Sequence, residues 1–406
     1  GHLQGNNADS GREERAPGPG QRWRAGLAAE SRTGAGVGSR QRARWSIAFM
    51  ITPPQPGPVL LFGSGETSAN GQQAFDWLFR RLDQPPQVAI LETPAGFELN
   101  SPQVARRIAK FLRQRLQNYA PAIALVPARR RGTAWSPDEP DVVAPLLRSN
   151  VMFLGPGSPS YAVRQLQDSL AWHTLRARQH LGAAVVLASA AAIAAGAFAL
   201  PVYEIYKVGE DLHWKPGLDL FADYGLKLAI VPHWNNNDGG AELDTSRCFM
   251  GLARFEALLT MLPAEAVVLG LDEQTALAID WAAGIAHVLG QGGVTVLRGA
   301  ATPVFGRGQS FSLTELGPYR LPEPGDSIPG PVWRQALAAA EARPATAEAP
   351  PEVLELVEQR QRARQHHDWA ATDSLRDQIE GLGWQVQDTA EGPKVSQKTV
   401  HSEQSW

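Results

Sequence analysis

The sequence predicts an α/β protein whose core is a doubly wound, mostly parallel sheet, followed by a small C-terminal helical hairpin module. Between residues 57 and 318, short apolar runs alternate with segments whose apolar residues recur at helical spacing. The runs are apolar throughout, which is typical of parallel strands covered by helices on both faces. Polar and glycine-rich loops follow several runs, and ligands bind such sheets at the carboxyl ends of their strands.

Bulk composition narrows the class of protein. The chain has 406 residues, 43% of them hydrophobic, which is enough for a sizeable core and a second small domain. Its formal net charge of -3 gives no overall attraction to nucleic acid or anionic membranes, and no apolar run reaches the roughly 20 residues of a membrane span. The single cysteine, Cys248, excludes an intrachain disulfide. We expect a cytoplasmic protein without metal or cofactor.

The first 56 residues differ from the rest of the chain. Residues 1–56 are rich in arginine and glycine and poor in large aliphatic side chains, so they have little apolar surface to bury. We therefore expect a disordered leader. An arginine-rich, acid-poor start is also typical of transit peptides, although no amphipathic period is present.

Nine apolar runs are predicted as strands. Helical spacing follows the first of them, with apolar side chains at Phe75, Leu78, Phe79 and Leu82, and follows the second over residues 104–116. The strands are expected at residues 59–62, 88–91, 123–126, 151–154, 183–187, 226–231, 266–271, 276–280 and 294–297.

Composition changes again after the last strand, and it divides the remaining chain. The core domain is expected over residues 57–318. Residues 319–350 are rich in Pro, Ala and Glu, which is typical of a linker. Residues 351–395 again carry apolar residues at helical spacing and are expected to form a separate module. Residues 396–406 are expected to be a disordered tail.

One serine stands where a buried strand turns into a helix of small residues. Ser189 follows the fifth predicted strand and precedes a run of alanines, the placement of a nucleophile elbow, where small neighbours let the backbone turn tightly and expose the hydroxyl. The N–H group of Ala190 would then point from the helix N-terminus at the reacting centre. The alternative is that Ser189 only caps the helix, and the local pattern alone favours this cap.

A histidine and two carboxylates end later strands. His233 follows the sixth predicted strand, and Asp272 and Glu273 follow the seventh. A histidine that removes a serine proton needs a carboxylate behind it to fix its tautomer and stabilise its cation. We therefore expect Ser189, His233 and Glu273 to meet at neighbouring strand ends, with Asp272 as the alternative partner, although a lone histidine is more often structural.

Loops around the same edge are expected to supply further contacts. The loop after the fourth strand reads Gly155-Pro156-Gly157-Ser158, and Gly157 is its expected oxyanion donor because a proline has no N–H group. Taken alone, such a loop is usually only a turn. The expected substrate contacts are Gly155, Ser158, Glu66, Asn235, Asn236 and Asp272, with Glu92, Tyr203, Glu204 and Lys207 as weaker candidates.

These motifs resemble those of a known family. Residues 57–318 look like the cyanophycinase and dipeptidase E family of serine peptidases, which implies a class I glutamine amidotransferase-like, flavodoxin-like fold. The family's Gly-x-Ser-Ala-Gly-Ala elbow is similar to residues 187–192, with Leu187 and Ala191 in place of its glycines, and its Gly-x-Asp-Glu-x-Thr-Ala segment is similar to residues 270–276. The resemblance implies that Ser189 is the nucleophile and that Glu273 completes the triad.

The last module resembles a different family. Residues 351–395 are similar to the C-terminal module of cysteinyl-tRNA synthetases, two helices followed by a Val-x-Asp-Thr-x-x-Gly strand at 386–392, which implies a tRNA or protein partner. The alternative is an amphipathic hairpin with a solvated charged face, since carboxylates balance its arginines. The nucleotide motifs and zinc-site cysteines of a working synthetase are missing from the sequence, so we do not expect synthetase activity.

The leading hypothesis is a hydrolase of peptide or amide bonds in small substrates that uses a Ser-His-Glu triad. The altered elbow at Leu187 and Ala191 supports a second hypothesis. In it the domain is a catalytically inactive pseudopeptidase that binds a ligand, and the C-terminal module binds tRNA or protein. The sequence leaves the oligomeric state open between a monomer and a homodimer.

Overall fold

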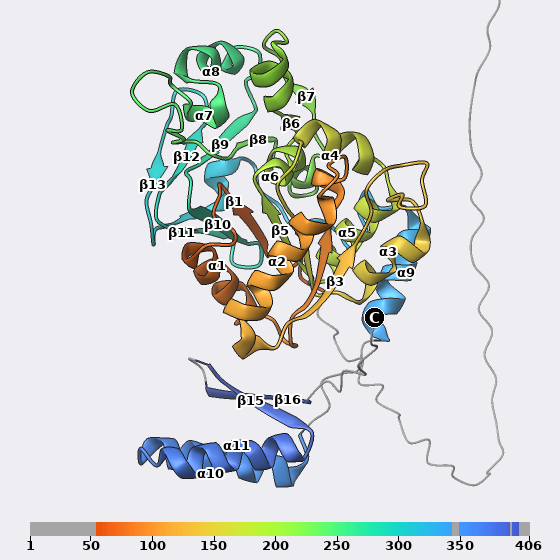
Figure 1. The fold of residues 1–406 in the computed structure, drawn as a ribbon, viewed down its shortest axis with the longest axis vertical. Coiled ribbons are helices and arrows are strands. Elements are labelled where there is room, and N and C mark those ends of the chain that lie inside the picture. The colour runs from red at the N-terminus through yellow and green to blue at the C-terminus, as the bar shows by residue number, and fades with distance from the viewer. Residues whose placement is uncertain (1–53, 343–348, 390–391, 398–406) are drawn as a thin grey trace, which may run out of the picture. The chain divides into compact units, whose positions relative to one another are not determined.

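The computed structural model describes residues 54–342, 349–389 and 392–397. It contains an α/β domain with two sheets and a small C-terminal module of two helices and two strands (Figure 1). The mixed α/β architecture with a mostly parallel central sheet confirms the predicted fold class. The predicted leader and tail lie almost wholly outside the described residues.

The larger sheet has eight strands in the order β14-β11-β10-β1-β5-β4-β2-β3. The strands from β1 to β3 in this order pair in parallel. On the other side of β1, the strands β10, β11 and β14 pair in antiparallel fashion. Its bounds are β1 (Val59–Phe62), β2 (Gln87–Leu91), β3 (Ala122–Val126), β4 (Val151–Leu154), β5 (Ala184–Ala188), β10 (Thr275–Asp280), β11 (Ile285–Gly290) and β14 (Ser310–Ser312).

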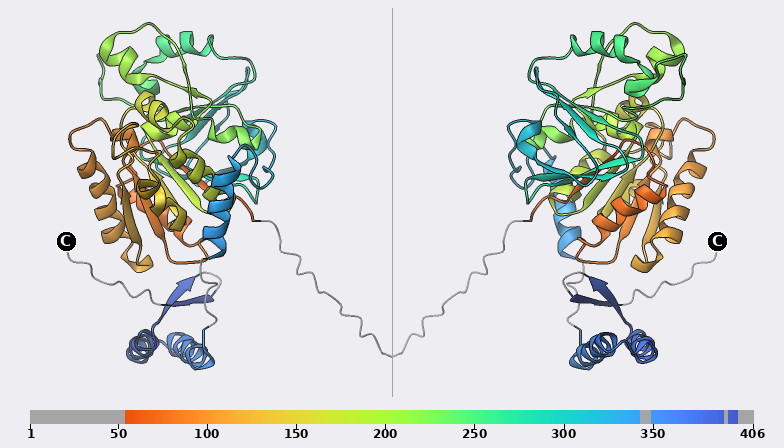
Figure 2. Two further views of the ribbon diagram at one scale, coloured as in Figure 1. Left: turned by 90° about the vertical axis from the view of Figure 1, so that its right-hand side faces the viewer. Right: turned by 90° about the vertical axis from the view of Figure 1, so that its left-hand side faces the viewer.

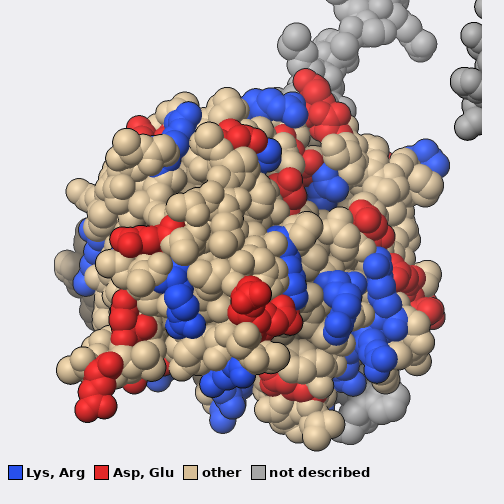
Figure 3. Space-filling model, turned by 90° about the horizontal axis from the view of Figure 1, so that it is seen from above, with Lys and Arg blue, Asp and Glu red and all other residues tan. Residues whose placement is uncertain are grey.

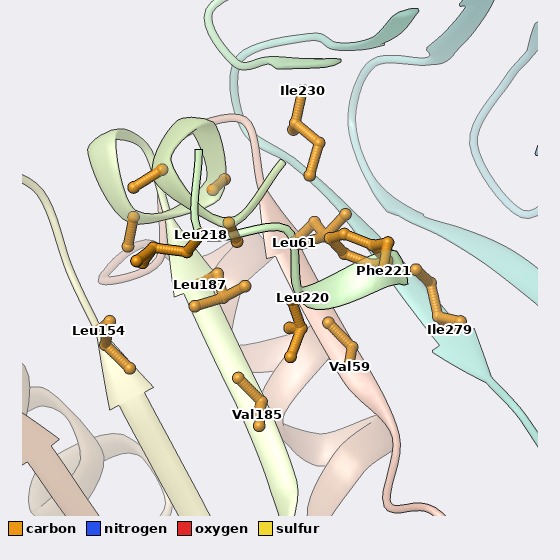
Figure 4. Packing of buried hydrophobic residues seen from close by; sticks show 14 of the residues in the cluster. Val59, Leu61, Leu154, Val185, Leu187, Leu218, Leu220, Phe221, Ile230 and Ile279 are labelled. Carbon is orange, nitrogen blue, oxygen red and sulfur yellow. The ribbon is translucent and has the colours of Figure 1, made fainter. Parts of the chain in front are cut away.

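Helices cover both faces of this sheet (Figures 1 and 2). Successive side chains of a strand point to opposite faces, so Leu60 and Phe62 pack in one apolar cluster while Val59 and Leu61 pack in the other. Figure 4 shows the second cluster around Leu187. The first face is covered by α1 (Ala69–Phe79) and α2 (Ser101–Arg115), and the second by α3 (Pro140–Arg148), α4 (Pro159–Leu166), α5 (Leu170–His180) and α6 (Ala190–Ala195).

A second, six-stranded sheet has the order β13-β12-β9-β8-β6-β7. Its strands β8 and β9 pair in parallel, and apolar side chains from this sheet pack against α6 and α8. Its bounds are β6 (Phe198–Ala199), β7 (Lys215–Pro216), β8 (Leu228–Val231), β9 (Val267–Leu271), β12 (Val294–Leu297) and β13 (Val304–Phe305), with α7 (Ser246–Phe249) and α8 (Leu252–Leu259) between β8 and β9.

The division into two sheets differs from the single sheet that the sequence predicts. All nine predicted strands are present within two residues of their predicted bounds. However, the chain crosses from β9 in the second sheet to β10 in the first over residues 272–274. The short strands β6, β7, β13 and β14 were not predicted, because two or three residues carry no period. The strand β11 was also missed, because His287 interrupts its short apolar run.

A helix lies inside the range predicted as a linker. The segment α9 (Gly330–Glu341) packs Val332 and Ala336 against Ala177 of α5. Alanine is the strongest helix former, so an alanine-rich composition that resembles a linker also supports a helix when apolar side chains share one face. The main domain therefore extends beyond its predicted end at residue 318.

The C-terminal module has its own small core. It consists of α10 (Pro351–Gln365), α11 (Trp369–Gly381) and the antiparallel strands β15 (Trp384–Thr389) and β16 (Gly392–Gln397). Arg360 is only 5% exposed, and its guanidinium donates two hydrogen bonds to the Asp388 carboxylate, at 2.8 and 2.9 Å. The core side chains are Val353, Val357, Ile379, Trp384 and Val386.

Two absences hold for the described residues. No helix in these ranges is both long and apolar enough to cross a membrane. No group of three or more His, Cys, Asp or Glu side chains in the same ranges is placed to hold a metal ion.

The stacking of Trp281 on Tyr224 provides a stability test of the core. Trp281 is 1% exposed, and the two ring centroids lie 3.5 Å apart. Trp281→Ala should lower the free energy of unfolding by about 3–5 kcal/mol, because the cavity cannot close fully. The control Trp135→Ala removes a ring that is 48% exposed and should cost less than about 1 kcal/mol. Urea unfolding measures both, and equal losses would show that Trp281 is not a core residue.

Candidate active site

Ser189 sits on a strained turn between β5 and α6. Its backbone has φ 52° and ψ -112°, a region that L-residues rarely occupy, and its N–H group donates to the carbonyl of Phe62 at 3.2 Å. Such strain costs on the order of 1–3 kcal/mol and is concentrated at functional sites. The Ser189 side chain accepts no hydrogen bond from the first turn of α6, so the alternative that it merely caps this helix is wrong.

The elbow is tightly packed in spite of its missing glycines. Leu187 is fully buried in the apolar cluster that also contains Leu218 (Figure 4). Ala190 and Ala191 are each 2% exposed. Methyl groups are therefore the largest side chains that directly flank Ser189 on the α6 side, and the leucine finds space within the core below the turn.

The side chains of Ser189, His233 and Glu273 form a continuous chain of contacts. Ser189 Oγ lies 2.9 Å from His233 Nε2, and His233 Nδ1 lies 3.1 Å from Glu273 Oε1. An ionised carboxylate can only accept, so a hydrogen on Nδ1 satisfies this contact and leaves Nε2 free to accept the serine hydroxyl hydrogen. His233 and Glu273 follow the adjacent strands β8 and β9, whereas Ser189 follows β5 of the other sheet. The three residues were predicted at the ends of neighbouring strands of one sheet. The structure instead brings them together from the ends of strands in two sheets.

Two asparagines hold Glu273 in place. Asn236 Nδ2 donates to Glu273 Oε1 at 2.9 Å, and the Glu273 N–H group donates to Asn235 Oδ1 at 2.8 Å. Asn236 is buried, with 4% exposure. The sequence predicted Asn235 and Asn236 as substrate contacts, but the structure places both beside Glu273, where they fix its backbone and its carboxylate.

Asp272 bonds to a different part of the domain from the histidine. Its Oδ2 accepts the N–H group of Gly293 at 2.8 Å, and burial raises the pKa of its carboxyl above the usual value. Between the two acids that the sequence left open as partners, only Glu273 contacts His233. Asp272 was also predicted as a substrate contact, yet it fastens β9 to the segment that precedes β12.

A left-handed turn packs behind His233. Three consecutive residues, Arg247, Cys248 and Phe249, have φ values of 56°, 59° and 67°, and His233 itself has φ 51°. The N–H group of Cys248 donates to the His233 carbonyl at 3.1 Å, and the N–H group of Arg247 donates to the Trp234 carbonyl at 2.9 Å. Left-handed backbone costs about 1–2 kcal/mol per L-residue, so these bonds stabilise an otherwise unfavourable conformation next to the imidazole.

A cavity of about 410 Å³ opens beside Ser189 and His233. Two backbone donors lie on its wall: among the described residues, the N–H groups of Gly157 and Ala190 have no protein acceptor. Gly157 has φ +150°, and a Cβ at this position would lie 2.0 Å from the Pro94 carbonyl oxygen. Only glycine fits there. The other lining residues are Pro159, Ile193, Val202, Tyr203, Tyr206, Lys207, Asp238, Cys248 and Phe249.

Several predicted contacts lie outside this cavity. Ser158 caps α4 by accepting the N–H group of Tyr161, and Gly155 lies against a separate small cavity. Glu66 does not line the cavity. Burial raises the pKa of its carboxyl above the usual value, and the nearby His233 only partly opposes this shift. Of the weaker candidates, Glu92 pairs with Arg129 at 2.6 Å and Glu204 with Lys215 at 3.0 Å.

Sequence reasoning missed most of the apolar wall. Tyr206 lies in a π-helical turn, Glu204–Val208, and such turns often occur at functional sites. Cys248 and Phe249 enter through the left-handed turn, which no glycine marks in the sequence. Two of the weaker candidates, Tyr203 and Lys207, do line the cavity. The proximity of Tyr206 to Tyr203 in the sequence was the signal that could have added it.

Comparison with known proteins gives different results for the two parts of the chain. Residues 346–394 match the cysteinyl-tRNA ligase anticodon binding domain. Over 48 residues they are 52% identical to cysteine–tRNA ligase of Methanosarcina mazei, which is 12% of this chain and 10% of that protein. Over 51 residues they are 49% identical to the Chlamydia felis enzyme, 13% of this chain and 11% of that protein. The chain thus spans about a tenth of the length of these relatives.

The main domain resembles solved peptidase structures. A peptidase from an acI-B1 actinobacterium superposes with a TM-score of 0.52 at 19% identity, over 64% of this chain and 98% of that one. A putative peptidase E protein from Listeria monocytogenes EGD-e has a TM-score of 0.36 at 13% identity, over 60% and 98% of the two chains. The likeness to the actinobacterial structure confirms the predicted fold. The match to the anticodon binding domain confirms the resemblance predicted for the C-terminal module.

The single cysteine allows a direct test of the cavity wall. Burial raises the pKa of the Cys248 thiol to about 12, and the nearby charge of Glu273 adds to the shift. A thiol of this pKa carries little thiolate at pH 8, so it should react with Ellman's reagent much more slowly in the folded protein than in urea. Since the chain has no other cysteine, the released chromophore reports this site alone. Equal rates in both states would show that the thiol is accessible.

Proposed function

We propose that the main domain hydrolyses peptide or amide bonds in small substrates, with Ser189 as nucleophile. The observation that carries the proposal is the series of contacts from Ser189 Oγ through the His233 ring to Glu273 Oε1 beside an open cavity. Nucleophile, base and orienting acid in this order are what acyl transfer through a serine requires.

In the proposed reaction, Ser189 Oγ attacks the carbonyl carbon while His233 Nε2 takes the hydroxyl proton. The oxygen that becomes negative accepts hydrogen bonds from the N–H groups of Gly157 and Ala190, which line the same cavity. The imidazolium is stabilised by Glu273 and returns its proton to the leaving amine. A water molecule then attacks the acyl ester by the same route, with His233 again as base, and releases Ser189.

The C-terminal module supports a second candidate function, binding of a tRNA. The specific observation in its favour is the match of residues 346–394 to an anticodon binding domain. Each of its four arginines already pairs with a carboxylate: Arg360 and Arg364 with Asp388, Arg362 with Glu358, and Arg376 with Glu380. Exposed ion pairs are weak, so Arg362 and Arg376 are the arginines that can exchange these carboxylates for phosphates.

The face of the molecule seen in Figure 3 offers little general attraction for RNA. On the face seen in Figure 3, acidic and basic side chains are interspersed, in keeping with the net charge of -3. RNA binding is therefore expected to depend on the module's few exchangeable arginines and to be strongly weakened by salt.

Labelling with a fluorophosphonate tests the proposed nucleophile. Wild type should be labelled and Ser189→Ala should not. Glu273→Gln should slow labelling about 10²- to 10⁴-fold, because the imidazole loses the carboxylate that orients it. The matched control Asp272→Asn leaves the Glu273 contact intact and should label at close to the wild-type rate. Absence of labelling in the folded wild type would favour the inactive pseudopeptidase.

A filter-binding titration of the full-length chain with bulk tRNA tests the second candidate. Arg362→Glu with Arg376→Glu should weaken retention and reduce the slope of log affinity against log salt by about 1–2, the value for one or two lost phosphate contacts. The control Arg106→Glu changes an exposed arginine of α2 and should leave the slope unchanged. Retention that is identical in all three proteins would exclude this mode of binding.

A further inference from the structure

The cavity beside Ser189 is walled mainly by apolar and aromatic groups from three separate elements. Ile193 projects from α6, Tyr206 from the π-helical turn, and Phe249 from the left-handed turn. Val202, Tyr203 and Pro159 extend this wall. Its volume of about 410 Å³ lies in the range of cavities that enclose small ligands.

The one ionisable sulfur in the wall does not add charge. Cys248 is 3% exposed, and its raised pKa keeps the thiol neutral at physiological pH. A neutral thiol behaves as a small hydrophobic group. The turn that carries Cys248 therefore adds to the apolar wall, and it offers no second nucleophile beside Ser189.

The charged residues of the cavity lie at its opening. Lys207 and Asp238 are both exposed, and Lys207 Nζ lies 4.9 Å from the centre of the Tyr206 ring. Arg247 directly precedes the lining residue Cys248 but does not itself line the cavity. Its guanidinium stacks on the Trp234 ring and donates to the Trp234 carbonyl. Lys215 and Glu204 pair with each other. A charged substrate side chain would thus enter the cavity without a buried partner, which is unfavourable.

We infer that this cavity receives an aromatic or large aliphatic side chain next to the scissile bond, so that the substrates are short apolar peptides. The cleavage of such peptides rests on the proposed function. The preference of the cavity for an apolar side chain does not depend on it. Tyr203, Tyr206 and Phe249 are the specificity-determining residues.

A matched set of fluorogenic peptides tests the inference. In Ala-X-aminomethylcoumarin, X is Phe, Leu, Asp or Lys, and the wild-type protein should show a kcat/KM at least about tenfold higher for Phe and Leu. In a fluorescence titration, Ser189→Ala should also bind the Phe and Leu peptides more tightly than the Asp and Lys peptides. The inference would be overturned if the Asp or Lys peptide had a kcat/KM, or an affinity for Ser189→Ala, equal to or higher than that of the Phe and Leu peptides.

The two assays separate the inference from the proposed function. If wild type neither cleaves these peptides nor reacts with a fluorophosphonate, the hydrolase proposal fails. The affinities for Ser189→Ala then still decide the side-chain preference. A preference for Phe and Leu in binding supports the inference without catalysis, whereas equal affinities for the four peptides overturn it.

A charge introduced into the wall provides the variant test. Tyr203 is 43% exposed and lines the cavity, so Tyr203→Arg adds a cation with little burden on folding. This change should shift the ratio of affinities for Phe and Asp peptides at least about tenfold toward Asp. The control Met261→Arg places the same charge at a 51% exposed site outside the cavity and should leave the ratio unchanged. An unchanged ratio in Tyr203→Arg would show that the side chain does not enter this cavity.

Discussion

The hydrogen bond between Ser189 Oγ and His233 Nε2 is the contact on which the rest of the site depends, because it joins residues held by two different sheets. Ser189 follows β5 of the eight-stranded sheet, and His233 follows β8 of the six-stranded one. A small rotation of one sheet against the other would break it. A cross-sheet contact opposes such a rotation: the His233 N–H group, after β8, donates to the Gly63 carbonyl, after β1. The cavity is formed at this same junction.

Backbone strain is concentrated around this contact. Ser189, His233, Gln274 and the turn from Arg247 to Phe249 all have positive φ values without being glycine. Such conformations persist only where the surroundings enforce them. Here the N–H groups of Ser189, His233 and Arg247 donate to the carbonyls of Phe62, Gly63 and Trp234. The strain exposes the serine hydroxyl above the sheet and turns the imidazole toward it. The free energy of folding thus maintains a geometry that relaxed backbone would not adopt.

Much of the fold, and part of the site, could be predicted from the sequence. Buried parallel strands such as β4 and β5 are short apolar runs that differ visibly from helical segments, and all nine predicted strands are present. The strand-to-helix turn at Ser189 and the order of His233 and Glu273 along the chain pointed to residues that the structure brings into contact. A likeness to known motifs was needed to favour the nucleophile over a helix cap.

The remaining features depend on interactions that one sequence does not encode locally. The separation into two sheets arises from pairing between distant strands, and Asn235 and Asn236 contact Glu273 across 38 and 37 residues. The turn from Arg247 to Phe249 carries no glycine to announce its left-handed backbone. Similarly, α9 was hidden in an alanine-rich stretch whose packing partner, α5, lies far earlier in the chain.

A crystal structure of the fluorophosphonate-treated protein would test the central claim most directly. We predict a phosphorus bonded to Ser189 Oγ, with the phosphonyl oxygen about 3 Å from the N–H groups of Gly157 and Ala190 and the His233 ring still in contact with Glu273. An unmodified Ser189 would contradict the account. So would an adduct whose phosphonyl oxygen points away from both N–H groups.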